Sequence, residues 1–345
     1  MLSYPTLEVI SHAPADRLNE DAWLALGAGP LGETIIAAAI DGATTRLTPP
    51  ALQDYLEQQP QPLTPAAFAA RLVRDSLARQ VGAGCPPDLR TLLLEANDDL
   101  GRALIGLFGA LTLDALRLPP DALPWPLQDP RLVRLGLPAA VMTLIEVDPR
   151  GGMLRFAHAG DTALLVAYAD GRFTVPTSQR TALDGDLLRL VQRLRADAPD
   201  QPFREAARHL EVERKNLLNA LAHNYVDEHG LPQPARGIGV LDGLPELRYF
   251  VQTGEVSLEG ALFVCVMTDG LLWPASAAEV FADNPAHANE LRRQRFAFMA
   301  EQIARKGLRG YLTALRAAEA GDPDHERYPR IKTHDDATGV LLRFS

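Results

Sequence analysis

Short apolar runs joined by tight turns occupy residues 139–175, and this pattern constrains the fold more than any other part of the chain. Residues 139–147 and 153–158 flank a turn that contains proline and two glycines, which predicts a β-hairpin. Residues 163–168 and 172–175 flank a second turn that ends in glycine and predict another strand pair. Antiparallel sheet is therefore expected in the middle of the chain.

The remaining patterns place helices in blocks around strands. Apolar, strand-like runs occur at residues 7–10, 22–26, 34–40, 247–253, 261–267 and 338–344. Helical spacing of apolar residues occurs at 64–80, 87–116 (one long helix or a broken pair), 186–225 and 276–320. Helices in blocks favour an α+β fold of antiparallel sheets covered by helices over a doubly wound parallel sheet. No linker divides the chain, so we expect a single domain over residues 1–345, with a helical excursion at about 178–236.

Composition excludes several classes of function. The 44 acidic residues outnumber the 34 basic ones, which argues against a nucleic-acid partner. No apolar run approaches the roughly 20 residues that span a bilayer, and the N-terminus lacks the pattern of a signal peptide. Cys85 and Cys265 are the two cysteines and form neither a disulfide framework nor a zinc motif. A cytoplasmic protein with no membrane partner is expected.

Acidic residues mark the ends of predicted strands at four places along the chain. These residues are Asp21, Asp41, Asp269 and Asp335. A carboxylate at the end of a buried strand is costly to desolvate unless it meets a cation or a hydrogen-bond donor. Asp41 and Asp269 each precede glycine, and either one alone is best explained as a turn residue. Together, the four carboxylates favour an oxygen-rich site for Mg²⁺ or Mn²⁺.

Five motifs in order resemble those of the metal-dependent protein phosphatases of type 2C, from about residue 10 to the end of the sequence. The motifs are Asn19-Glu20-Asp21, Asp41-Gly42, His158-Ala159-Gly160-Asp161, Thr268-Asp269-Gly270 and Asp335-Asp336-Ala337-Thr338. The resemblance implies a four-layer α-β-β-α sandwich of two antiparallel sheets flanked by helices. It also implies a centre of two Mn²⁺ or Mg²⁺ ions, in which Asp41 bridges both ions and the Gly42 carbonyl binds one of them. Asp269 and Asp335 would ligate the other ion, and Asp21 would act through metal-bound water.

The function that follows from the resemblance is a protein serine/threonine phosphatase that hydrolyses phosphate monoesters with metal-activated water. Its substrate would be a phosphoprotein, such as a Ser/Thr kinase or the targets of one. Arg17 has the side chain for bidentate phosphate binding, although it stands one residue nearer to Asp21 than the arginine of the family. A surface arginine is the alternative. Asp129 is a candidate ligand for a third ion, and a solvated turn aspartate before proline is the alternative there.

Residues around these motifs depart from the family pattern and leave other functions open. Ala43-Thr44-Thr45 replaces the further glycine pair that usually follows Asp41-Gly42. One alternative function is a non-catalytic, phosphoprotein-binding or regulatory module, and another is a hydrolase of small phosphate esters. His158 is expected to be a hydrogen-bonded core or turn histidine, and Asp336 is expected to bind backbone groups. Arg236 is a candidate residue of a flap beside the site.

Overall fold

Two five-stranded antiparallel sheets form the centre of the molecule in the computed structural model, which describes residues 4–28, 34–43, 47–61, 63–84, 88–118, 129–177, 182–196, 198–208 and 221–345. The first sheet has the order β1 (Thr6–His12), β10 (Ala337–Arg343), β9 (Ala261–Met267), β6 (Ala163–Tyr168) and β7 (Phe173–Thr174). The second has the order β2 (Ala22–Ala28), β3 (Thr34–Ala43), β4 (Ala139–Asp148), β5 (Met153–Ala159) and β8 (Gln252–Ser257).

Helices cover the outer faces of both sheets. The second sheet is covered by a group that comprises α1 (Pro50–Glu57), α2 (Pro65–Gly82), α3 (Leu89–Phe108) and the short α4 (Leu113–Leu116). The first sheet is covered by α8 (Ala277–Val280) and α9 (Pro285–Ala320). The described residues also include the short 3₁₀ helices η2 (Pro130–Leu135), η3 (Pro245–Tyr249) and η4 (Asp269–Leu271). In the described part of the chain, no helix is long and apolar enough to cross a bilayer.

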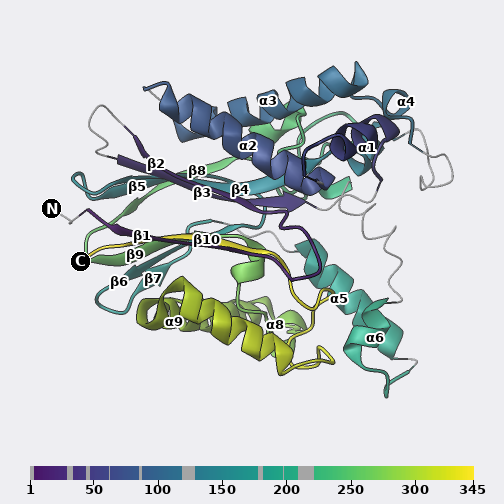
Figure 1. The fold of residues 1–345 in the computed structure, drawn as a ribbon. Helices are drawn as coiled ribbons and strands as arrows, with labels where there is room; N and C mark the ends of the chain where they lie inside the picture. The colour runs from purple at the N-terminus through teal and green to yellow at the C-terminus, as the bar shows by residue number, and fades with distance from the viewer. Residues whose placement is uncertain are drawn as a thin grey trace.

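Three apolar cores separate the four layers (Figure 1). One lies between α1–α3 and the second sheet, one between the two sheets, and one between α9 and the first sheet. Alternation along β3 shows why two cores meet on one strand. Ile36 and Ile40 face the helices, whereas Ile35 and Ala37 face the other sheet, as a strand buried on both faces requires.

The predicted fold class is confirmed, and most predicted elements are present within a few residues of their expected bounds. The 87–116 segment is the broken pair, α3 and α4, with Gly109 after α3 at φ 77°. The predicted strand at 247–253 is wrong in its first half, because Pro245 starts η3 and the strand begins only at Gln252. Helix α1 has no counterpart in the sequence predictions. Cys85 and Thr44-Thr45 lie outside the described residues.

Within its described residues, the predicted excursion includes the helices α5 (Ala182–Arg195) and α6 (Phe203–Arg208). They pack on each other through Val191 and Phe203, and Phe281 and Ile331 pack against the same small cluster. Figure 1 shows both helices beyond the end of the sheets at which β3 finishes. The 221–242 segment returns to the second sheet, where Ala140 and Leu241 exchange backbone hydrogen bonds of 2.9 and 2.8 Å.

Candidate metal centre

The space between the sheets changes from apolar to polar at one end. On β3 the inward-facing series Ile35, Ala37 and Ala39 ends at Asp41, and on β9 the series Val264 and Val266 is followed by Thr268. The neighbouring strands also change from apolar to polar at the same level, because every second side chain of a strand points to the same face of its sheet. The polar inward-facing residues are Ser11, Asp21, Asp41, Thr143, His158, Thr162, Thr268 and Thr338.

Asp21 and Asp41 are neighbours in the second sheet. Ala22 is opposite Ile40, so the residue before Ala22 comes beside the residue after Ile40. Burial raises the pKa of each carboxyl well above its ordinary value, and the negative charge of Asp269 raises both further. The Thr268 hydroxyl donates a 2.8 Å hydrogen bond to Asp21 and partly offsets this effect. Two carboxylates held this closely favour a cation between them.

Asp269 enters the site from the first sheet through a close approach of two loops. It begins η4 directly after β9 and the buried Thr268. A Cβ atom on Gly270 would lie 1.8 Å from the Asp336 carbonyl oxygen, so no larger residue fits there without moving the loop. Glycine is therefore required at position 270 for close packing, and this packing brings Asp269 against the segment that carries Asp335.

Asp335 is held between two cations of this chain. Its Oδ1 lies 3.1 Å from Arg17 Nη2, and its Oδ2 lies 2.7 Å from Lys332 Nζ. Burial alone would raise the pKa of Asp335, but the charges of Lys332 and Arg17 outweigh it and hold the pKa below its ordinary value. Burial opposes the charge of Lys332, whereas Asp335, Asp269 and Asp41 together raise its pKa. Sequence reasoning missed Lys332, because a lone lysine in a loop carries no pattern.

Asp336 supports the neighbouring backbone, as expected. It is buried, and its Oδ2 accepts a 2.8 Å hydrogen bond from the Glu20 backbone N–H. Its Oδ1 lies 3.4 Å from Arg17 Nη2. The hydrogen bond from Glu20 fixes the chain directly before Asp21 against the loop before β10.

Gly42 has a packing role in addition to the role predicted for its carbonyl. A Cβ atom there would lie 2.5 Å from the Glu20 carbonyl oxygen and 2.7 Å from that of Ala66 in α2. The absence of a side chain thus lets α2 and the segment before β2 close on β3. Metal ligation by the Gly42 carbonyl stays a prediction.

Asp129 has partners of its own. Its side chain caps η2 by accepting a 3.0 Å hydrogen bond from the Arg131 backbone N–H, and it forms an ion pair with the Arg131 guanidinium at 2.5 Å. That guanidinium holds the pKa of Asp129 below its ordinary value. The assignment of Asp129 to a third ion stays a prediction, and such an ion would have to displace Arg131.

His158 is a hydrogen-bonded core residue, as predicted. It is fully buried, with Nδ1 2.9 Å from the Thr143 hydroxyl, which in turn lies 2.7 Å from that of Thr162. This neutral network lies between the apolar core and the carboxylates. Asp161, next to Thr162, adds its charge to those that raise the pKa of Asp41.

The donor set fits hard divalent ions. The side chains that meet at this end are carboxylates with hydroxyl neighbours, which suit Mg²⁺ or Mn²⁺. The mutual repulsion of Asp21, Asp41 and Asp269 is the electrostatic signature of a cation site. As the described side chains stand, however, no group of three acidic, histidine or cysteine side chains converges closely enough to hold an ion. Binding would therefore require side chains to reorient, above all Asp335, whose two oxygens face Arg17 and Lys332.

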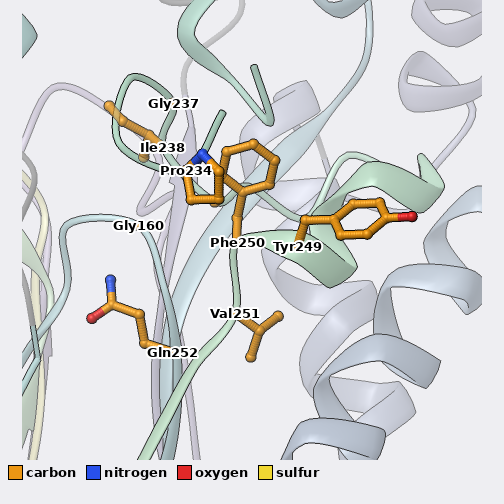
Figure 2. Close-up of a pocket in the computed structure, with 9 residues that line it drawn as sticks. Gly160, Pro234, Gly237, Ile238, Tyr249, Phe250, Val251 and Gln252 are labelled. Carbon is orange, nitrogen blue, oxygen red and sulfur yellow. The ribbon is translucent and has the colours of Figure 1, made fainter. Parts of the chain in front are cut away.

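A pocket of about 220 Å³ lies at the end of β5, where Gly160 follows the strand. Gly160, next to Asp161, forms part of its wall, and Gln252 pairs with His158 across β5 and β8. Figure 2 shows Ile238 and Pro234 of the 221–242 segment facing the pocket together with Phe250. The pocket thus lies between the end of β5, the start of β8 and the 221–242 segment.

Comparisons with solved structures find likenesses that extend over the whole chain. A bacterial serine phosphatase aligns with a TM-score of 0.51 and 12% identity over 99% of this chain and 98% of that chain. The serine/threonine phosphatase Stp1 from Staphylococcus aureus aligns with a TM-score of 0.48 and 12% identity over 100% and 97%. RsbX, crystallised in complex with magnesium, aligns with a TM-score of 0.46 and 10% identity over 100% of both chains. No protein-family model matches the sequence, and no curated protein matches it.

Identities this low establish the fold and leave the chemistry to the residues of this chain. The alignment with the bacterial serine phosphatase covers both sheets and their flanking helices. The two antiparallel sheets and their flanking helices agree with the architecture that the motifs implied. The chain has the fold of the metal-dependent protein phosphatases of type 2C.

Proposed function

We propose that this protein is a Mn²⁺- or Mg²⁺-dependent protein serine/threonine phosphatase. The observation that carries the proposal is the meeting of carboxylates from four separate segments at one end of the sheets. These are Asp21, Asp41, Asp269 and Asp335. A fold alone does not fix a function, but a group of like charges that are partly or fully buried is costly to keep unless a cation binds.

Each residue has a role in this proposal. Asp41 would hold both ions, together with the Gly42 carbonyl, and Asp269 and Asp335 would complete the ligand set. Two bound ions would supply an activated water and would neutralise charge on the phosphoryl group. Arg17 is half-exposed at the edge of the cluster, 3.1 Å from Asp335, where its guanidinium can bind phosphate oxygens in a bidentate manner.

The pocket at the end of β5 supports a protein substrate over a small ester. Its volume of about 220 Å³ suits one apolar side chain, and Ile238 and Phe250 offer apolar walls. A residue that flanks a phosphoserine or phosphothreonine would reach it from the phosphoryl site. The physiological phosphoprotein, such as a kinase or its targets, would be selected there.

A non-catalytic, phosphoprotein-binding module is the second candidate, and one observation favours it. Arg17 and Lys332 place two cations at the mouth of the cluster, an arrangement that can bind a phosphate group without any metal ion.

Hydrolysis assays separate these candidates. Turnover of p-nitrophenyl phosphate and of a phosphothreonine peptide is measured with Mn²⁺, with Mg²⁺ and with EDTA. We expect metal-dependent hydrolysis of both compounds and none in EDTA. Hydrolysis of the aryl phosphate alone would indicate the small-ester hydrolase. Peptide binding without any turnover would overturn the enzyme and support the binding module.

A further inference from the structure

The side chain of Lys332 places a positive charge directly beside a proposed metal ligand. Lys332 Nζ lies 2.7 Å from Asp335 Oδ2, and the charges of Asp269 and Asp41 also act on it. The ammonium group thus contacts one of the carboxylates assigned to the ions and lies within the electrostatic influence of two others. Only three of the 34 basic residues in the sequence are lysines, so a lysine at this position stands out in a chain that otherwise uses arginine.

The loop around Lys332 is fixed on both sides. Arg330 forms an ion pair with Asp322 at 2.7 Å, and Arg316 donates a 2.6 Å hydrogen bond to the Asp335 carbonyl. His334 Nδ1 lies 2.8 Å from Glu319. The position of the ammonium group therefore follows from a braced loop and is not that of a loose surface side chain.

We propose that Lys332 is a tethered counter-ion of the carboxylate cluster, which competes with a divalent metal ion for Asp335 and withdraws when the ion binds. The inference rests on the metal site of the proposed function. A lysine suits this task because its ammonium is a compact point charge on a flexible stem, unlike the planar guanidinium of arginine. Its side chain is 42% exposed, which leaves it room to swing toward solvent. In the metal-free protein it lowers the repulsion among the carboxylates, and it thereby raises the concentration of metal ion that the site needs.

Metal binding measured without substrate tests this inference. Mn²⁺ is titrated calorimetrically into the wild type, Lys332→Met and the control Lys306→Met, which changes an exposed lysine on α9. We expect Lys332→Met to bind Mn²⁺ on the order of fivefold to tenfold more tightly, the equivalent of one partly exposed ion pair. The control should bind like the wild type. Unchanged or weaker binding by Lys332→Met would overturn the proposal.

Thermal melting gives a second readout. In EDTA, Lys332→Met should melt at a lower temperature than the wild type, because the carboxylates lose their counter-charge, and saturating Mn²⁺ should close the gap. An equal melting temperature in EDTA would contradict the counter-ion role. If Lys332→Met does not fold, Lys332→Gln provides the uncharged variant for the same titration. These measurements need no turnover, so a protein that binds Mn²⁺ as described but hydrolyses nothing would refute the proposed phosphatase activity alone.

Discussion

At the scale of single residues, Asp21 and Asp41 lower the stability of the metal-free protein near neutral pH, because their folded-state pKa values are raised. Asp41 is partly buried, and its pKa is raised by desolvation and by the charges of Asp269, Asp21 and Asp161. A folded-state pKa above the unfolded value means that the folded protein holds the proton more tightly. The contribution of Asp41 to the free energy of unfolding is therefore fully present below the unfolded pKa of about 4. This contribution is lost as the pH rises through the higher folded-state pKa.

The substitution Asp41→Asn should therefore act in opposite directions on activity and on stability. We expect it to remove most of the Mn²⁺-dependent hydrolysis, as should Asp269→Asn and Asp335→Asn, because each replaces an anionic ligand with a neutral one. In EDTA near pH 7, Asp41→Asn should raise the melting temperature and flatten the loss of stability with rising pH. Asp283→Asn, in an exposed loop position, is the control. Near-wild-type turnover by Asp41→Asn at saturating Mn²⁺ would show that no ion depends on this residue.

At the scale of elements, a buried ion pair fastens the 221–242 segment to η2. Arg134 of η2 and Asp242 lie 3.0 Å apart, with side chains 4% and 1% exposed. Asn224 joins them through a 3.2 Å hydrogen bond to Asp242. On the same segment, the guanidinium groups of Arg131 and Arg236 both lie over the ring of Tyr225. The predicted flap residue Arg236 thus stacks within its own segment.

Loss of this pair should cost far more than loss of a surface pair. Asp242→Asn would leave the buried Arg134 with only Glu246, at 3.3 Å, and should lower the free energy of unfolding by about 3 kcal/mol. Glu255→Gln removes the exposed pair with Arg155 and should cost less than about 1 kcal/mol. Urea unfolding of both variants measures the difference. Equal and small effects would mean that the 221–242 segment is not held by Asp242.

The pocket gives the 221–242 segment a testable part in substrate choice. Ile238→Trp should fill the pocket and lower kcat/KM for a phosphopeptide by about tenfold, the usual worth of one apolar side-chain contact. Turnover of p-nitrophenyl phosphate should stay within about twofold of the wild type, since this ester does not reach the pocket. Leu231→Trp, an exposed position on the same segment, is the control. Equal losses of kcat/KM on both substrates would show that Ile238 has a structural role and does not contribute to the choice of substrate.

Local sequence patterns predicted the elements that have strong periodicity and failed where tertiary contacts decide. Residues 139–159 were readable as a hairpin because apolar alternation and turn residues agree there. Residues 247–249 were not, since their apolar character is the same in a strand and in a 3₁₀ turn, and Pro245 selects the turn. Asp41 and Asp269 were found from strand ends followed by glycine. Lys332 was not found, because only the folded loop brings it to Asp335.

At the scale of the whole molecule, the site connects the two sheets. Asp21 and Asp41 belong to the second sheet, whereas Asp269 and Asp335 flank β9 and β10 of the first. Between the sheets the contact is an apolar core, which is non-directional. An ion bound by both pairs of carboxylates would add a directional link at one end.

Binding of Mn²⁺ should therefore stabilise both sheets as one unit. At a hundredfold excess over its Kd, an ion that binds only the folded state adds about 2.7 kcal/mol. Hydrogen exchange with and without Mn²⁺ should show slower exchange in β3 and β4 of one sheet and in β9 and β10 of the other. Protection limited to the loops around Asp41 or Asp335 would argue for a local site on one sheet.

The place of β10 in its sheet has a consequence for how the protein is made. β10 comes last of the strands along the chain, yet it lies between β1 and β9, and Asp335 directly precedes it. Arg17 and Asp335, which form an ion pair, are 318 positions apart. While the ribosome is still translating, β1 has no neighbour to pair with and the carboxylate cluster lacks a member. The candidate site therefore cannot assemble until residues 337–343 have left the exit tunnel, so the order of synthesis makes this site one of the last features of the fold to form.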